Sequence, residues 1–351
     1  IMALTSYLLS RVRTLDPGSF ALVMATGIVS IGATQHGMLM LARVLFAINV
    51  VAYIVLVVLS VLRFVDARRG LLADFANPAR GASFLTFSAG SCVLASQCIV
   101  VVRWPITAMV LAVIGALSWA ALLYTLLAVV ITGQHKPGLR RSINGSWLIA
   151  VVATQALVIV LTLLLAGPER GSAAAWMFVA ICLYLIGAAL YLILITLIFQ
   201  RLLFLPLAAS GFTPPYWINM GALAITTLAG SLIVLHTSAQ PALVELLPFV
   251  RGFTLFFWAT ATWWIPLLTI LEIWHHGIRH IRLGYATADW DIVFPLGMYA
   301  VCTDVLSLAL NLGFLQPLVT ISVYVSLLVW ALIAAAELRS WYPESLPQRE
   351  G

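Results

Sequence analysis

Residues 146–165 read SWLIAVVATQALVIVLTLLL, a run of 20 residues without a charge, a glycine or a proline. At 1.5 Å per residue, a helix of this length spans about 30 Å, which is the thickness of the hydrocarbon core of a bilayer. A helix satisfies its own backbone hydrogen bonds in lipid, and the run lacks the polar and apolar alternation of a barrel strand. This stretch therefore predicts a transmembrane α-helix.

Nine further runs of the same kind flank it, each bounded by charge, proline or glycine. The ten predicted helices cover residues 17–35, 41–60, 82–99, 107–126, 146–165, 174–196, 215–236, 250–272, 290–313 and 317–338. We expect an all-α polytopic membrane protein, with residues 1–351 forming a single transmembrane domain.

The composition agrees with a membrane protein and excludes a water-soluble globule. Apolar residues make up 63% of the chain and charged residues 9%, against about 45–50% and about 25% in soluble domains. The chain has a net charge of +6, but its basic residues lie in short loops between spans, so we expect no nucleic-acid partner. The four cysteines lie inside apolar runs without metal-ligand spacing, and we expect neither a metal nor a cofactor. No cleavable signal peptide is recognised at the start.

The basic residues predict the orientation of the chain. Fourteen of the 18 Lys and Arg residues fall on one side of the predicted helices, and four fall on the other, namely Arg43, Arg103, Arg170 and Arg251. By the positive-inside rule both termini are cytoplasmic, and an even number of spans agrees with this. We expect location in the inner (plasma) membrane.

A repeat organises the predicted helices. An aromatic residue opens every odd-numbered span, at Phe20, Phe84, Trp147, Trp217 and Trp290, with intervals of 64, 63, 70 and 73 residues. One helical hairpin is thus used five times in the same orientation, and its pseudo-symmetry axis runs along the membrane normal.

Odd and even spans also differ in composition. The odd set has 22 Ser, Thr, Asn or Gln residues and 8 Gly, and the even set has 13 and 3. Small and hydroxylated residues suit close helix contacts or a wet path better than lipid contact. We expect five inner odd helices surrounded by five outer even ones. Two interpretations stay open: these residues line a central pore, or they serve helix packing alone.

Three segments resemble a known family: PGSFALVMATGIVSIG (17–32), FFWATATWW (256–264) and WDIVFPLGMYAVCT (290–303). They are similar to the tellurite-resistance and dicarboxylate transporter family, which also includes the plant slow anion channels, the yeast malate permease and the fungal sulfite exporters. The resemblance implies a pore along five inner helices, closed by a phenylalanine of the ninth helix, and a homotrimer with one pore per subunit. Here the matching phenylalanine is Phe294. Kink prolines of some relatives are absent from spans three, five and seven.

Phe294 also has a physical rationale as a gate. Pro295 and Gly297 follow it, and a proline inside a helix removes one hydrogen bond and kinks the chain. A phenyl ring across a narrow, weakly polar tube excludes hydrated ions. In a membrane helix the alternative for any phenylalanine is packing against lipid or core.

An anion path needs donors that bind weakly enough to release the ion. The candidate pore-lining residues on the inner helices are Phe20, Thr26, Gly27, Ser30, Ser88, Ser91, Thr154, Gln155, Asn219, Gly221 and Thr226. Each one taken singly also suits a helix contact. Arginines at the two mouths, including Arg63, Arg80, Arg201 and Arg279 on the inner side, attract anions or mark topology.

Asp304 lies about 14 residues into the ninth span, where an unpaired charge is costly. One hypothesis pairs it with Arg43 or Arg251, the nearest cations in depth. The other keeps it neutral as a proton carrier. His276 and His280 stand four apart, but their position beside arginines at a helix end favours a role at the interface over metal binding.

The sequence therefore predicts gated transport of small anions through a central pore that Phe294 occludes. The resemblance suggests C4-dicarboxylate-like or inorganic oxyanions as substrates. The alternative is a proton-coupled dicarboxylate or sulfite carrier that uses Asp304. An enzyme is not expected, because His, Asp and Cys side chains do not gather in the middle of the predicted spans. A sensor or scaffold is a third alternative, and it would carry no flux.

Overall fold

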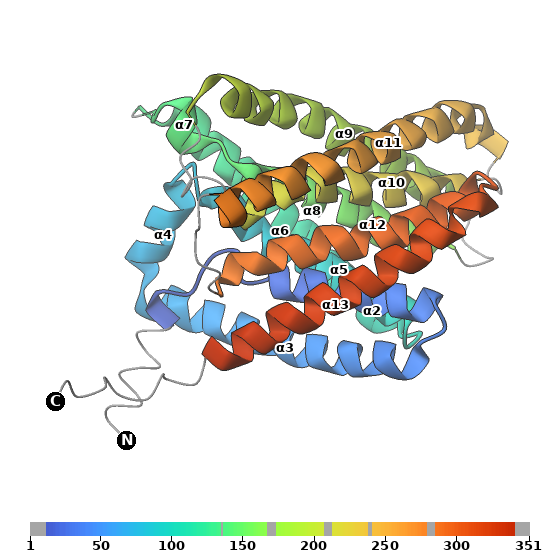
Figure 1. Cartoon of the computed structure of the whole chain (residues 1–351), viewed down its shortest axis with the longest axis horizontal. Coiled ribbons are helices and arrows are strands. Elements are labelled where there is room, and N and C mark those ends of the chain that lie inside the picture. The colour runs from blue at the N-terminus through green and yellow to red at the C-terminus, as the bar shows by residue number, and fades with distance from the viewer. Residues whose placement is uncertain are drawn as a thin grey trace.

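The computed structural model describes residues 12–134, 136–166, 173–206, 213–237, 241–278 and 285–340. Within these ranges the chain is helical and contains no strand (Figure 1). The predicted all-α class is thus confirmed.

Two sets of long helices alternate along the chain. The first set is α2 (Ala21–Gln35), α5 (Thr86–Val100), α8 (Ile149–Leu165), α10 (Ile218–Thr237) and α12 (Trp290–Ala309). The second set is α3 (Leu39–Asp66), α6 (Pro105–Thr132), α9 (Ala173–Phe204), α11 (Leu247–Glu272) and α13 (Gln316–Ser340). Two short helices, α4 (Arg68–Ala76) and α7 (Leu139–Ser142), lie between long ones.

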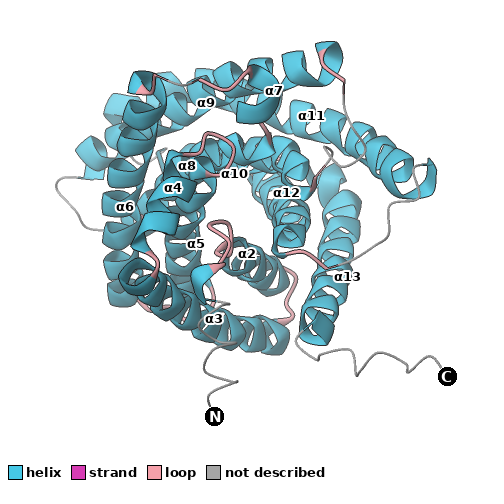
Figure 2. Ribbon diagram, turned by 90° about the vertical axis from the view of Figure 1, so that its left-hand side faces the viewer, coloured by secondary structure: helices cyan, strands magenta, loops and turns pink. Residues whose placement is uncertain are grey.

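The first set forms a closed ring. α2 packs against α5, α5 against α8, α8 against α10, α10 against α12, and α12 returns to α2. Figure 2 shows this inner ring with α3, α6, α9, α11 and α13 around it. Each outer helix packs on the inner helix that precedes it in sequence, and α3, α6, α9 and α13 also contact the next inner helix.

Burial separates the two sets in the way that their composition predicts. In the most apolar stretch of the helix that ends at Thr237, 94% of the residues are buried, whereas the value is 17% for the helix that ends at Ser340. Small and hydroxylated residues therefore lie in the inner helices, and large apolar residues face outward from the outer helices.

The lengths of the helices differ from the predicted spans. Among the described residues, nine helices are long and apolar enough to cross a bilayer, and α2, with 15 residues, is shorter. The ten-span count stays a prediction. Outer helices are longer than expected: α3 has 28 residues and continues past the charged Arg63.

Four of the five inner helices begin with a tighter turn, and two of the repeated aromatic residues form hydrogen bonds to outer helices there. A 3₁₀ turn precedes α5 (Gly81–Leu85), α8 (Gly145–Leu148), α10 (Pro214–Trp217) and α12 (Thr287–Asp289). The indole nitrogen of Trp217 donates to Glu272 Oε1 at 2.7 Å, and that of Trp290 donates to Glu337 Oε2 at 3.2 Å. Each indole thus fixes the start of an inner helix to the end of its outer partner.

Candidate transport pathway

The orientation of α12 follows from its contacts with outer helices. The indole nitrogen of Trp258 on α11 donates to Thr303 Oγ1 at 3.0 Å, and the hydroxyls of Thr262 and Tyr299 are hydrogen-bonded at 2.8 Å. Ala300 packs against α13. Since successive residues of an α-helix are about 100° apart, these contacts define the outward face of α12.

Two close contacts define the flanks of the same helix. A methyl group at Gly221 of α10 would lie 2.8 Å from Cγ of Pro295. A methyl group at Gly297 would lie 2.9 Å from Cγ2 of Ile28 on α2. Phe294 lies between Pro295 and Gly297 around the helix and opposite the outward face, so its ring is directed to the inside of the ring of helices. Its exposed fraction is 1%.

The hydroxyls that the sequence nominates as pore donors are hydrogen-bonded to neighbouring helices or to their own helix. Indole nitrogens of outer helices donate to Thr26 Oγ1 (from Trp330, 3.0 Å) and to Thr154 Oγ1 (from Trp119, 2.9 Å). The remaining bonds join Ser30 Oγ to the Ala42 carbonyl, Ser88 Oγ to the Gly115 carbonyl, Ser91 Oγ to the Phe87 carbonyl and the Tyr53 hydroxyl, and Thr226 Oγ1 to the Ala222 carbonyl. These contacts favour the packing interpretation.

The two amide candidates differ from each other. Gln155 Nε2 donates to the backbone carbonyl of Tyr184 on α9 at 3.0 Å, so Gln155 is directed to an outer helix. Asn219 is fully buried, and neither atom of its amide group has a hydrogen-bond partner among the described residues. The sequence could not separate these two cases, because both are polar residues inside an inner span.

The inward faces left by these contacts are apolar. On α8, Thr154 and Gln155 are directed outward, and the opposite face has Ala156 and Val160, both buried. On α2, Thr26 and Ser30 are directed outward, and Met24 lies on the opposite face. The interior of the ring is consequently weakly polar in these helices, as a hydrophobic constriction requires.

Among the predicted glycines, Gly27 and Gly221 are contact residues. A methyl group at Gly27 would lie 2.6 Å from Cγ1 of Val93 on α5, so this glycine permits close packing of α2 and α5. Gly221 does the same for α10 and α12 at Pro295. Small residues at such crossings are typical of helix packing in membranes.

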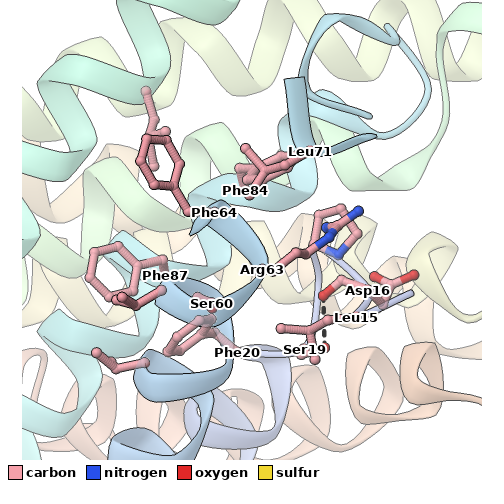
Figure 3. A pocket seen from close by; sticks show the side chains of 14 residues that line it. Leu15, Asp16, Ser19, Phe20, Ser60, Arg63, Phe64, Leu71, Phe84 and Phe87 are labelled. Carbon is pink, nitrogen blue, oxygen red and sulfur yellow. Dashed lines mark hydrogen bonds between the residues drawn. The ribbon is translucent and has the colours of Figure 1, made fainter. Parts of the chain in front are cut away.

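Phe20 lines a side cavity of about 320 Å³ between the segment that precedes α2 and the helices α3, α4, α5 and α6. Its ring centroid lies 5.1 Å from that of Phe87 and 5.9 Å from that of Tyr53, in edge-on geometry. Figure 3 shows Arg63 and Asp16 toward one side of the cavity and Phe87 toward the other. Phe20 therefore faces α3 and α5.

Three arginines at the end where α12 begins, Arg63, Arg80 and Arg201, contact carboxylates or carbonyls. Arg63 is buried and paired with Asp74 of α4, and Arg80 contacts Asp74 at 2.8 Å and Asp16 at 3.7 Å. The short helix α4, which contains Asp74, is not among the predicted helices, so the sequence gives no carboxylate partner for Arg63 or Arg80. Arg201 donates to the carbonyl of Ile143, and Arg279 lies outside the described residues.

The predicted pairing of Asp304 with an arginine is wrong. Asp304 Oδ1 accepts a hydrogen bond from Gln316 Nε2 of α13 at 3.1 Å, because the turn between α12 and α13 brings Gln316 beside it. Arg43 and Arg251 are exposed, and neither forms an ion pair with Asp304 in the described part of the chain. Asp304 lies between the α2 flank and the outward face of α12, away from the interior.

The histidine pair is only partly described. His280 and the side chain of His276 lie outside the described part of the chain, and the neighbouring His275 is buried. Within the described ranges, no three His, Cys, Asp or Glu side chains gather as a metal site would require. The structure thus gives no reason to revise the interfacial interpretation.

One buried carboxylate of this region, Asp291, is not among the predicted site residues. Asp291 lies in the first turn of α12, three residues before Phe294, and has an exposed fraction of 8%. Residues three apart share a helix face, so Asp291 and Phe294 lie on the same inward side. The spacing alone, a carboxylate three residues before the candidate gate within a predicted span, is the signal that could have identified it.

A closed ring of apolar helices with an inward aromatic residue is an architecture typical of membrane channels and transporters. The sequence model of the voltage-dependent anion channel family, SLAC1, matches residues 14–338, nearly the whole chain. The chain belongs to this family and is therefore an anion channel or transporter of the membrane.

Proteins that are similar to this chain are likewise described as a membrane protein or as transporters. An uncharacterized membrane protein of Mycobacterium tuberculosis is 40% identical over 149 residues, which cover 42% of this chain and 75% of the relative. Two uncharacterized transporters of Methanocaldococcus jannaschii are 23% and 24% identical, with 84% and 83% of this chain covered and 85% and 83% of the relatives.

Proposed function

We propose that the chain conducts small anions along the axis of the inner ring and that Phe294 closes this path. The main support is the position of Phe294, whose ring is buried on the inward face of α12 between the contacts of Pro295 and Gly297. A ring held there by two close helix contacts is a rigid obstacle, and its apolar surroundings offer a hydrated anion no compensation for lost water.

C4-dicarboxylate-like anions and inorganic oxyanions are the proposed substrates, from the resemblance of the motifs. The proposed assembly is a homotrimer in the inner (plasma) membrane with both termini cytoplasmic. The distribution of Lys and Arg supports this orientation. Arg63 and Arg80 lie at the end of the bundle that the rule assigns to the cytoplasm.

The proton-coupled carrier with Asp304 as proton site has weaker support. Asp304 has a hydrogen-bond partner on α13 and faces away from the interior. A carrier that uses this residue would have to bring it into the path by a rearrangement of α12.

The test is anion flux into proteoliposomes that contain wild type or Phe294→Ala. We expect the substitution to raise flux of nitrate and chloride several-fold, with a smaller gain for malate because of its size. Phe257→Ala is the matched control, since Phe257 is equally buried but lies on the outer helix α11 and packs against Tyr191 and Phe253. A Phe294→Ala protein that folds and is no leakier than the Phe257→Ala protein would refute the gate.

A further inference from the structure

Asp291 is a buried carboxylate that the proposed gate does not explain. Its exposed fraction is 8%, and no hydrogen bond or ion pair joins its side chain to another residue in the described part of the chain. An ionisable residue inside a membrane segment is costly, and such residues usually face a cavity or path and serve function. An unpaired ionised carboxylate in apolar surroundings is destabilising by far more than a neutral one.

Its position relates it directly to the path. Asp291 and Phe294 are three residues apart on α12, slightly less than one turn, which is a rise of about 4.5 Å. Relative to Phe294, Asp291 is rotated toward Pro295, the side that packs on α10, and away from Thr303, which faces α11. The carboxylate therefore lies on the inward side of the helix, nearer to the end of the bundle that we assign to the cytoplasm.

The charges that act on Asp291 are of the same sign as its own carboxylate. The acidic side chains of Asp16, which precedes α2, and Asp289, in the turn before α12, lie close enough to disfavour a negative charge on Asp291. On the other elements packed against α12, Glu337 of α13 accepts from Trp290, Glu272 of α11 accepts from Trp217, and Tyr216 precedes α10. The nearby cations are held elsewhere: Arg80 contacts Asp16 at 3.7 Å, and Arg201 lies over the Tyr216 ring at 5.8 Å.

These observations give Asp291 two states with opposite effects on an anion. Ionised, it places a negative charge beside the path in surroundings of low dielectric, where repulsion is poorly screened. Protonated, it is neutral and can donate a hydrogen bond to a passing anion. Protonation of Asp291 thus removes an electrostatic barrier to the anion and provides a weak binding site for it.

We propose that Asp291 is a proton-operated electrostatic barrier, so that anions pass rapidly when it is protonated and slowly when it is ionised. The proposal rests on the proposed function, because it requires that anions follow the axis that Phe294 closes. It assigns to Asp291 the regulation of the same path, and it predicts that flux rises as the pH falls.

The experiment measures nitrate flux in proteoliposomes at equal pH on both sides and at zero membrane potential, from mildly alkaline to mildly acidic pH. All proteins contain Phe294→Ala, so that the ring does not limit the rate. We expect flux of the parent to rise several-fold toward acidic pH. Adding Asp291→Asn should give the high rate at every pH, and Asp291→Glu should keep the pH dependence.

Asp304→Asn is the matched control, because it neutralises a carboxylate of the same helix that faces away from the interior. It should leave the pH profile of the parent unchanged. Asp291→Asn with the pH profile of the parent would overturn the barrier while the conduction path stands. A Phe294→Ala parent without flux would instead overturn the proposed function itself. A folded state is checked for each variant by gel filtration and thermal melting.

Discussion

At the residue scale, two glycines and a proline set how closely the helix with the gate approaches its neighbours. The ring of Pro295 packs closely against Gly221, and the side chain of Ile28 packs closely against Gly297. The proline ring is rigid, whereas the end of an isoleucine side chain can move. The contact at Gly221 is therefore the less tolerant of the two.

We predict that Gly221→Ala destabilises the protein by about 1–3 kcal/mol through overpacking against Pro295. The thermal midpoint of purified protein in detergent measures this loss. Gly252→Ala on the outer helix α11 is the control, since no atom lies within 4 Å of the added methyl group. Equal midpoints for the two variants would contradict the assigned contact.

The sequence singled out Phe294 through the family resemblance, and Pro295 and Gly297 gave it a physical rationale, because proline and glycine have direct effects on a helix. It could not orient the phenyl ring, which requires the contacts of Pro295 with α10 and of Gly297 with α2. It also passed over Asp291, although the spacing to Phe294 was available. Asp304 was a candidate because it lies deep in the predicted span. Its hydrogen-bond partner Gln316 is uncharged, so a search for an oppositely charged residue could not predict it.

At the element scale, outer helices are fixed to inner ones by aromatic donors. Tyr53, Trp119, Trp258 and Trp330 bond to hydroxyls of Ser91, Thr154, Thr303 and Thr26, in four of the five helix pairs. Each bond joins an outer helix to the next inner helix rather than to its own partner. The repeated donors therefore link consecutive pairs around the ring.

Thr154→Val tests whether such a hydroxyl serves packing or transport. Valine keeps the shape and removes the acceptor of Trp119, so we expect a loss of stability of about 0.6 kcal/mol and at most about 1.7. Relative fluxes of nitrate, chloride and malate in the Phe294→Ala background should not change. Thr260→Val, at a half-buried threonine of α11 whose hydroxyl bonds to the Phe256 carbonyl of its own helix, is the control.

A change in anion selectivity with Thr154→Val, but not with Thr260→Val, would show that Thr154 lines the pore.

The sequence predicted that hydroxyls concentrate in the inner helices, which the structure bears out. It could not predict their direction, because a threonine that faces an outer helix and one that faces the axis occupy the same kind of span. The predicted spans of the outer helices are also too short. For example, α3 continues beyond residue 60 through the charged Arg63, which pairs with Asp74.

At the scale of the whole molecule, the recurrence of aromatic residues predicted a repeated hairpin, and the composition of odd and even spans predicted the alternation of inner and outer helices. The all-helical class and the burial of the odd set agree with it. The closure of the ring between α12 and α2 joins the first and last pairs of the chain, and it depends on contacts such as Gly297 with Ile28 that no local pattern reveals.

The central claim is that anions move through the middle of this ring past position 294. Met298 lies one turn beyond Phe294 on the inward face, and Ala300 is equally buried but packs against α13. The measurement is labelling of Met298→Cys by a water-soluble charged thiol reagent added from the cytoplasmic side, with and without Phe294→Ala, and with Ala300→Cys as control. We predict rapid labelling and block of flux for Met298→Cys only when Phe294 is replaced. A leaky Phe294→Ala protein in which Met298→Cys is labelled no faster than Ala300→Cys would contradict a path through the ring.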